Sequence, residues 1–203
     1  MKVALIGATG NAGSRVLAEL VKRGHQVTAI ARTPEKVAKL KGVTAVKGDL
    51  DKSDLLPKAM AGHDAVISSV KFKTYNTQAL VDAVRKSGVK RYLVVGGAGS
   101  LIMPSGQMLM ETPEFPEAVK PEAQAGGRLL DQLKATKDLD WTFISPSMIF
   151  QPGQRTGKYR TGKDHLLFPE KGPSTISMED FAIAMVDELE KPKHSKERFT
   201  VGY

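Results

Sequence analysis

Short apolar runs alternate with longer amphipathic stretches along almost the whole chain. The apolar runs are rich in β-branched residues, as strands buried on both faces are, and they cover residues 3–6, 27–31, 43–47, 65–69, 92–95 and 141–145. In the stretch 77–87, Leu80, Val81 and Val84 fall on one helical side while Asp82 and Arg85 face water. Such stretches predict helices over residues 13–23, 34–40, 55–60, 77–87 and 122–135.

The repeated strand–helix–strand order predicts an α/β fold with a doubly wound, mostly parallel sheet. This rhythm is interrupted by two long irregular stretches, one from Gly96 to Pro121 after the fifth strand and one from Pro146 to Pro173 after the sixth. Both leave the carboxyl ends of strands, where open α/β sheets bind ligands. A last helix over 177–189 and a final strand over 198–201 complete one domain, residues 1–203.

The composition narrows the class of protein. Of the 203 residues, 41% are apolar and 26% charged, and none is cysteine. The lack of cysteine excludes disulfide scaffolds and thiolate sites, and it suits a reducing cytoplasm, where we expect the protein. No apolar run approaches the roughly 20 residues of a membrane span, so we expect no membrane partner. The four histidines, which have no partners at ligand spacing, predict no metal site; they are His25, His63, His165 and His194.

The net charge is positive but dispersed. Thirty Lys and Arg residues against 22 Asp and Glu residues give a formal charge of +8. The cations form no block, and aromatic residues make up only 6% of the chain. Both features argue against a nucleic-acid partner, which needs clustered cations or stacking platforms. Anionic small ligands explain the excess as well, so we expect a small-molecule partner; a homodimer is left open.

The strongest motif is the run Gly7-Ala8-Thr9-Gly10-Asn11-Ala12-Gly13, which follows the first strand directly and opens a helix. Gly7 would permit the tight turn, Gly10 would let a pyrophosphate approach the backbone, and Gly13 would let the helix pack closely on the strand. This context predicts a dinucleotide site whose residues in the run are Gly7, Thr9, Gly10, Asn11, Ala12 and Gly13. The alternative is a glycine turn that serves only helix packing.

The end of the second strand bears on the choice of nucleotide. An acid there usually accepts hydrogen bonds from the ribose 2′-hydroxyl of NAD. This chain has Arg32 and Thr33 instead, with Lys36 close behind. A guanidinium pairs well with a 2′-phosphate, so the sequence favours NADP over NAD. The alternative is a solvated arginine at a strand end.

Two further strand ends supply candidate cofactor-binding residues. The third strand closes in Gly48-Asp49-Leu50, where Asp49 could accept from the adenine amino group or, instead, serve a turn or cap. Asp51 or Ser53 could then cap the next helix. The fourth strand ends in Ser68-Ser69 beside the first strand, so these serines could border the pyrophosphate or merely form a turn.

Three later motifs accompany these residues: Gly96-Gly97-Ala98-Gly99-Ser100-Leu101, Asp140-Trp141-Thr142 with Ser145-Pro146, and Pro152-Gly153-Gln154-Arg155-Thr156-Gly157. With the glycine run and Arg32, they resemble an atypical short-chain dehydrogenase/reductase over essentially the whole chain. The resemblance is nearest to the NmrA-like group of NAD(P)H-flavin reductases, which is related to biliverdin-IXβ/flavin reductase. It implies a Rossmann fold with strand order 3-2-1-4-5-6 and a bound nicotinamide nucleotide, with Pro146 beside it.

The chain departs from ordinary short-chain dehydrogenases, which carry Tyr-x-x-x-Lys on the helix after the fifth strand. That region here contains no tyrosine over residues 120–127. The same spacing recurs at Tyr159 and Lys163, but the glycines 157 and 162 argue against a helix there, and without one the two side chains share no face. We therefore assign no catalytic residue.

A missing proton donor favours an acceptor that needs none. A flavin can take up hydride and delocalise the charge, so the protein mainly has to align the two rings. We expect Ser100, Ser147, Arg155 and Tyr159 in the substrate pocket, with Arg155 either holding a flavin phosphate or serving as surface charge. The leading hypothesis is an NADP-dependent oxidoreductase with a flavin or similar planar substrate. The alternative is an NmrA-like redox sensor that binds NADP(H) without turnover and regulates a partner protein.

Overall fold

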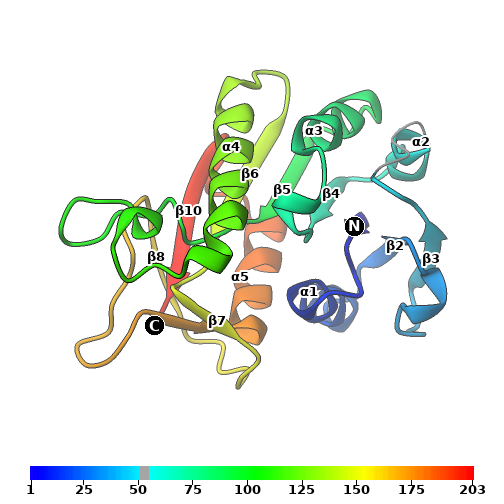
Figure 1. Ribbon diagram of the computed structural model, residues 1–203. Coiled ribbons are helices and arrows are strands. Elements are labelled where there is room, and N and C mark those ends of the chain that lie inside the picture. The colour runs from blue at the N-terminus through cyan, green and yellow to red at the C-terminus, as the bar shows by residue number, and fades with distance from the viewer. Residues whose placement is uncertain (51–54) are drawn as a thin grey trace.

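One mixed sheet forms the centre of the molecule (Figure 1). The computed structural model describes residues 1–50 and 55–203. Within them, eight strands follow the order β3-β2-β1-β4-β5-β6-β10-β8, and β10 and β8 extend the six-strand order that the resemblance implied. The strands are β1 (Lys2–Ile6), β2 (Gln26–Ala31), β3 (Val43–Lys47), β4 (Ala65–Ser68), β5 (Arg91–Val95), β6 (Asp140–Ser145), β8 (Arg160–Gly162) and β10 (Glu197–Gly202). All neighbouring pairs are parallel except β10 with β8.

Alternate residues of each central strand enter different cores. In β1, Val3 and Leu5 belong to a core with α1 (Asn11–Lys22) and α5 (Met178–Glu190). Ala4 and Ile6 belong to a second core on the other face, with α2 (Leu56–Met60), α3 (Thr77–Lys86) and α4 (Lys120–Ala135). The sheet is therefore covered on both faces, which confirms the doubly wound α/β prediction (Figure 1).

Two predictions near the start of the chain need correction. The stretch 34–40 forms only a 3-10 turn, η1 (Pro34–Lys36), after which Val37 is extended. Val37 is its one buried apolar residue and Leu40 is 39% exposed, so no apolar stripe holds a longer helix in place. The strand β3 is not buried on both faces, because it lies at the sheet edge and is largely exposed. Asp51 and Ser53, the suggested caps, lie outside the described residues.

The two long stretches after β5 and β6 are more ordered than the sequence indicates. The first contains the 3-10 turns η3 (Leu109–Glu111) and η4 (Glu117–Val119). The second contains β8 as well as β7 (Ile149–Gln151) and β9 (Thr175–Ser177), which pair with each other. The backbone of Ile102 bonds to residues 164 and 166, so the two stretches hold each other at one end of the sheet (Figure 1). In the part of the chain that the structure describes, no helix has the length and apolar character needed to cross a membrane.

Candidate functional site

The glycine run forms a tight loop between β1 and α1. Gly7 has a φ of +85°, and a Cβ there would lie 2.0 Å from the carbonyl oxygen of Ser69. A Cβ at Gly13 would lie 2.1 Å from the carbonyl oxygen of Gly7. The two residues are therefore glycine because the loop, the helix and the end of β4 pack without space for a side chain.

Gly10 differs from the other two glycines of the run, because packing does not require it to lack a side chain. A Cβ there would meet only the carbonyl oxygen of Gly7, at an ordinary 3.5 Å. Gly10 is exposed and caps α1 in an extended conformation, and the first turn of α1 carries no acidic residue. The amino end of the helix carries partial positive charge, so this position offers an anion the close approach that a side chain would block.

A cleft of about 360 Å³ opens beside this loop. We call it the glycine-loop cleft. Its lining includes six of the residues predicted to bind the cofactor: Gly7, Thr9, Gly10, Arg32, Leu50 and Ser69. Four strands bring them together, since they stand at the carboxyl ends of β1, β2, β3 and β4. The segment after β4 adds Lys71, Thr74 and Tyr75, which the sequence analysis missed.

Positive charge dominates this cleft. Arg32 is exposed, and its guanidinium carbon lies 5.7 Å from the centre of the Tyr75 ring, within the range of a cation–π contact. Lys71 is the second cation in the lining. No Asp or Glu occurs among the described residues that line the cleft. The cleft therefore suits a ligand that combines a ring system with anionic groups.

Three predicted cofactor-binding residues stand near the glycine-loop cleft without lining it. Asp49 lies between Gly48 and Leu50, which do line it, and is half-buried. The backbone carbonyl of Thr33 accepts from the amide of residue 36, 3.1 Å away, in η1. Ser68 turns away, because its hydroxyl is buried at 2.9 Å from the Tyr92 hydroxyl. Only Ser69 of the serine pair therefore reaches the cleft.

Apart from Gly13, whose packing role is described above, three predicted cofactor-binding residues remain, and they lie at helix or strand ends. The carbonyl of Asn11 accepts from the Ser14 hydroxyl within the first turn of α1, at 3.0 Å. Ala12 packs against the core beneath that helix. Pro146 is buried directly after β6. Among the described residues, none of the three lines the glycine-loop cleft.

A second, larger cleft of about 760 Å³ lies at the carboxyl ends of β4, β5 and β6. We call it the apolar cleft. Most of its wall is hydrocarbon, from Phe72, Ala98, Met103, Leu109, Phe115, Val119, Met148 and Ile149. The turn after β4 separates it from the glycine-loop cleft, since Lys71 and Thr74 line that cleft while Phe72 lines this one. The two clefts therefore share a border.

Helix α4 fixes this border through its first turns. Both carboxylate oxygens of Glu122 accept backbone hydrogen bonds, from the amides of Phe72 at 2.6 Å and Lys73 at 3.0 Å. One turn further on, Gly126 leaves space for the Phe72 ring, which a Cβ would meet at 2.9 Å. The Phe72 ring also stacks on Phe143 of β6, with ring centres 6.3 Å apart. The apolar wall is therefore held by packing and by two charge-assisted hydrogen bonds.

Of the four residues predicted for a substrate pocket, Ser100 lines the apolar cleft. Its Oγ accepts a hydrogen bond of 2.8 Å from Arg198 of β10, and Arg198 also donates to Asp164 at 2.8 Å. Ser147 is buried instead and donates to the carbonyl of Val201 at 2.9 Å. It therefore serves to join β10 to the residues after β6.

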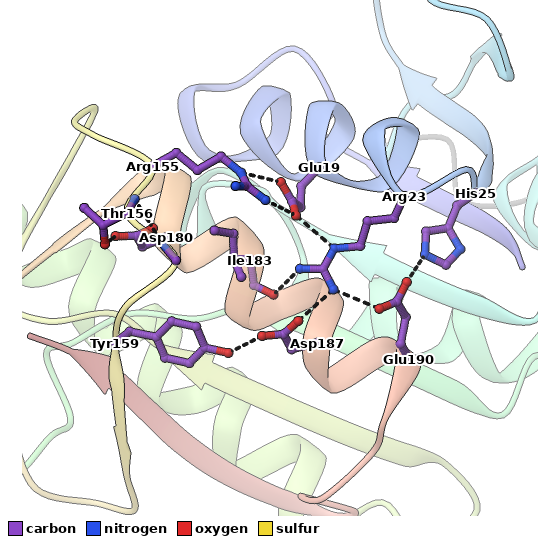
Figure 2. Close-up of polar contacts among 11 residues, drawn as sticks. Glu19, Arg23, His25, Arg155, Thr156, Tyr159, Asp180, Ile183, Asp187 and Glu190 are labelled. Atoms are coloured by element: carbon purple, nitrogen blue, oxygen red, sulfur yellow. Dashed lines mark hydrogen bonds and ion pairs between the residues drawn. The ribbon is translucent and has the colours of Figure 1, made fainter.

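Arg155 and Tyr159 lie on the other side of the sheet, against α1 and α5 (Figure 2). Arg155 donates two hydrogen bonds to the buried carboxylate of Glu19, at 2.9 and 3.0 Å. Tyr159 donates to Asp187 of α5. Neither residue lines one of the two clefts, so the structure does not bring them to the predicted pocket.

The segment around Tyr159 also has no helix. Residues 160–162 form β8, which places Tyr159 and Lys163 at the two ends of a strand. Burial raises the pKa of the Tyr159 hydroxyl, and the hydrogen bond to Asp187 adds to this rise. The expectation that this segment is not helical is therefore confirmed.

Tyr75 and Phe72 had only a weak signal in the sequence. Both follow β4 at the same sheet edge that drew attention to Ser69, but their run contains no strong motif. Met148 and Ile149 likewise follow the Ser145-Pro146 motif by a few residues. An extension of the carboxyl-edge argument by seven residues beyond each strand would have included them.

The fold and the glycine-loop cleft define a nucleotide-binding α/β protein of the Rossmann class. The chain belongs to the NAD(P)H-binding family, whose model matches residues 7–192. This agrees with the resemblance to atypical short-chain dehydrogenases/reductases that the sequence motifs carried.

Individual proteins resemble the chain over its full length. It is 41% identical over 211 residues to the uncharacterized protein YwnB of Bacillus subtilis (strain 168), with 99% of this chain and 98% of that protein covered. A solved structure from Bacteroides thetaiotaomicron, provisionally assigned as an epimerase, shows 44% identity and a TM-score of 0.94 over 100% of this chain and 96% of that one. A structure from Streptococcus pneumoniae TIGR4, provisionally assigned as an NADH-flavin reductase, shows 39% identity and a TM-score of 0.87 over 100% and 99%.

Proposed function

We propose that this protein is an NADPH-dependent oxidoreductase that passes hydride to a flavin or a similar planar acceptor. The observation that carries the proposal is the pair of clefts with a common border. One cleft has cations and an open glycine loop, and the other has a large apolar wall. A nucleotide in the first would extend toward an acceptor ring in the second, across the turn that holds Lys71 and Phe72.

The residues of the glycine-loop cleft fit a nicotinamide nucleotide. Gly10 and the amino end of α1 would take the pyrophosphate, and Arg32 would take the 2′-phosphate that distinguishes NADPH from NADH. The Streptococcus relative is described with NADH, so the choice of nucleotide needs its own test. Bound NADPH would supply a hydride, so that the nicotinamide is oxidised while the acceptor gains two electrons and a hydrogen, and solvent would supply any further proton.

The epimerase assignment of the Bacteroides relative gives the competing activity. An epimerase needs a positioned acid and a positioned base at the reacting carbon. Two carboxylates line the apolar cleft, Glu114 and Glu122, and both oxygens of Glu122 already accept backbone amides. Glu114 is exposed. This arrangement favours a reductase, in which alignment of two rings is the main requirement.

The decisive experiment measures NADPH oxidation by the pure protein with riboflavin, FMN and FAD as acceptors, by the loss of reduced-nicotinamide absorbance. We expect acceptor-dependent turnover that disappears in Gly10→Val, because valine fits the extended backbone at this position but occupies the space of the pyrophosphate. Circular dichroism and thermal melting check that this variant is folded.

Tight NADPH binding without turnover with any acceptor would contradict the reductase and favour the redox sensor. Unchanged NADPH affinity in folded Gly10→Val would contradict the placement of the nucleotide. We also propose a cytoplasmic location, as the cysteine-free sequence indicated, and cell fractionation tests it.

A further inference from the structure

The two clefts differ in the sign of their charged residues. The glycine-loop cleft has Arg32 and Lys71 in its lining, without an acidic residue among the described ones. The apolar cleft has Glu114 and Glu122, and the residues described in its lining include no Lys or Arg. The first cleft therefore attracts anions, whereas the second repels them.

Two arginines that could have offset the negative charge of the apolar cleft are paired with carboxylates outside its lining. Arg155, for which the sequence left open a flavin phosphate or a surface-charge role, is paired with Glu19 against the α1–α5 face (Figure 2). Arg198 stands behind Ser100, where its guanidinium is paired with Asp164 and its side chain is 7% exposed. Glu122 is held in the wall by the hydrogen bonds that its carboxylate oxygens accept from two backbone amides. A phosphate in the apolar cleft would thus lack a counter-charge.

Ser100 is the polar group that the cleft offers to an uncharged ligand. Its Oγ lone pair accepts from Arg198, which leaves its own O–H free to donate. The hydroxyl of Thr112, also in the lining, is already used on the carbonyl of Leu109 at 2.9 Å. A donor backed by a guanidinium is suited to a ring carbonyl.

From these observations we infer that the acceptor is an uncharged planar ring that carries a carbonyl group, such as a flavin without its phosphate. The inference rests on the proposed function, because it assumes that the apolar cleft takes the acceptor. It adds a selectivity that the proposed function does not contain: riboflavin is preferred over FMN, although the two share the same ring.

Riboflavin and FMN make a matched pair for the test, since they differ only in the phosphate. Binding is measured by quenching of flavin fluorescence in the presence of NADP, and turnover by NADPH oxidation. We expect riboflavin to bind about tenfold more tightly than FMN or better, with a matching difference in kcat/KM. Added salt should narrow the difference, because it screens the repulsion.

A charge-reversal variant tests whether the negative charge of the cleft causes the preference for riboflavin. Glu114→Lys should bring the affinity for FMN close to the affinity for riboflavin. Glu114 is exposed and lines the cleft, so the protein should tolerate the substitution. Glu117→Lys is the control: Glu117 is also exposed, lies three residues away and is outside the described lining of the cleft. It should leave the preference for riboflavin unchanged.

The outcomes separate this inference from the proposed function. Turnover in which FMN equals or exceeds riboflavin would overturn the inference and leave the reductase intact. Selective riboflavin binding without any NADPH oxidation would support the charge selectivity of the apolar cleft but contradict the reductase, and with it the role of that ligand as an acceptor. A folded protein that binds neither flavin, or a Glu114→Lys variant that still rejects FMN as the wild type does, would contradict the charge argument.

Discussion

At the scale of single residues, the three glycines of the run beside the glycine-loop cleft differ in what packing requires of them. Gly7 and Gly13 are required by packing, because a Cβ at either would lie within about 2.1 Å of backbone. Gly10 is free of this constraint, so packing does not account for its lack of a side chain, and the proposed approach of a pyrophosphate would use the open space. Arg32 stands at the mouth of the same cleft beside the Tyr75 ring.

Arg32 gives the residue-scale prediction. Arg32→Ala should weaken NADPH binding by about tenfold or more while the affinity for NADH changes much less, because only NADPH offers a 2′-phosphate to the guanidinium. Arg32→Lys should recover part of the NADPH affinity through its charge. Isothermal titration calorimetry with both nucleotides measures this.

The matched control is Lys39→Ala, which removes an exposed cation outside the described lining of the cleft. It should alter neither affinity. If Arg32→Ala weakened the binding of NADPH and NADH equally, Arg32 would act through its contact with Tyr75 or with the adenine rather than through the 2′-phosphate.

At the scale of elements, α4 sets the shape of the apolar cleft. Its first turn fixes the segment after β4 through Glu122, and its Gly126 admits the Phe72 ring. The start of the stretch after β5 also presses on it, because a Cβ at Gly99 would lie 2.5 Å from the Cβ of Ala123. The glycines of this region therefore permit close packing between a helix and two loops.

Adjacent glycines of α4 give the element-scale prediction. Gly126→Ala should lower the free energy of unfolding by about 1 kcal/mol, because the clash with Phe72 exceeds the gain in helix propensity. Gly127→Ala should raise it by about 0.5–1 kcal/mol, since its Cβ would meet only the Met110 methyl group at an ordinary 3.9 Å. Urea denaturation measures both, and a gain in Gly126→Ala would show that the ring moves freely.

At the scale of the whole molecule, a polar network joins α1, α5 and the stretch after β6 (Figure 2). Glu19, 5% exposed, accepts from Arg155 and from Arg23, and Arg23 reaches Asp187 and Glu190 of α5. Burial acts to raise the pKa of Glu19, but hydrogen bonds from Arg155 and Arg23 outweigh it, so that pKa lies below its ordinary value. The carboxylate form thus stabilises the folded chain.

This network gives the whole-molecule prediction. At pH 7, Glu19→Gln should lower the free energy of unfolding by about 1–3 kcal/mol, because two charge-assisted contacts are weakened. The lowered pKa means that the wild-type advantage is complete above the unfolded-state value of about 4.3 and is lost as pH falls through the folded-state pKa. Urea denaturation at several pH values should therefore show the two proteins converging in acid.

Glu117→Gln is the control for this comparison, because Glu117 is 83% exposed and its pair with Lys120 lies on the surface. It should change the free energy of unfolding by less than about 0.5 kcal/mol at any pH. A constant difference between wild type and Glu19→Gln across the pH range would show that lost packing, not charge, is the cause.

Much of the fold was determined by the sequence alone, because buried parallel strands and amphipathic helices leave local patterns. The six apolar runs became β1 to β6 with ends shifted by at most one residue, and the glycine loop, Arg32, Leu50 and Ser69 meet as their positions at strand ends required. The alternation of apolar runs and amphipathic stretches determines which strands and helices form. In a parallel sheet, the carboxyl ends of the strands then meet at one edge.

Only the tertiary structure decided what depends on pairing between distant segments. Nothing local to Arg155 indicates that Glu19, 136 residues earlier, holds it away from the clefts. The three-residue strands β7, β8 and β9 exist through partners far along the chain. The apolar cleft likewise draws its wall from three strand ends and α4, so its charge balance became visible only once the chain had folded.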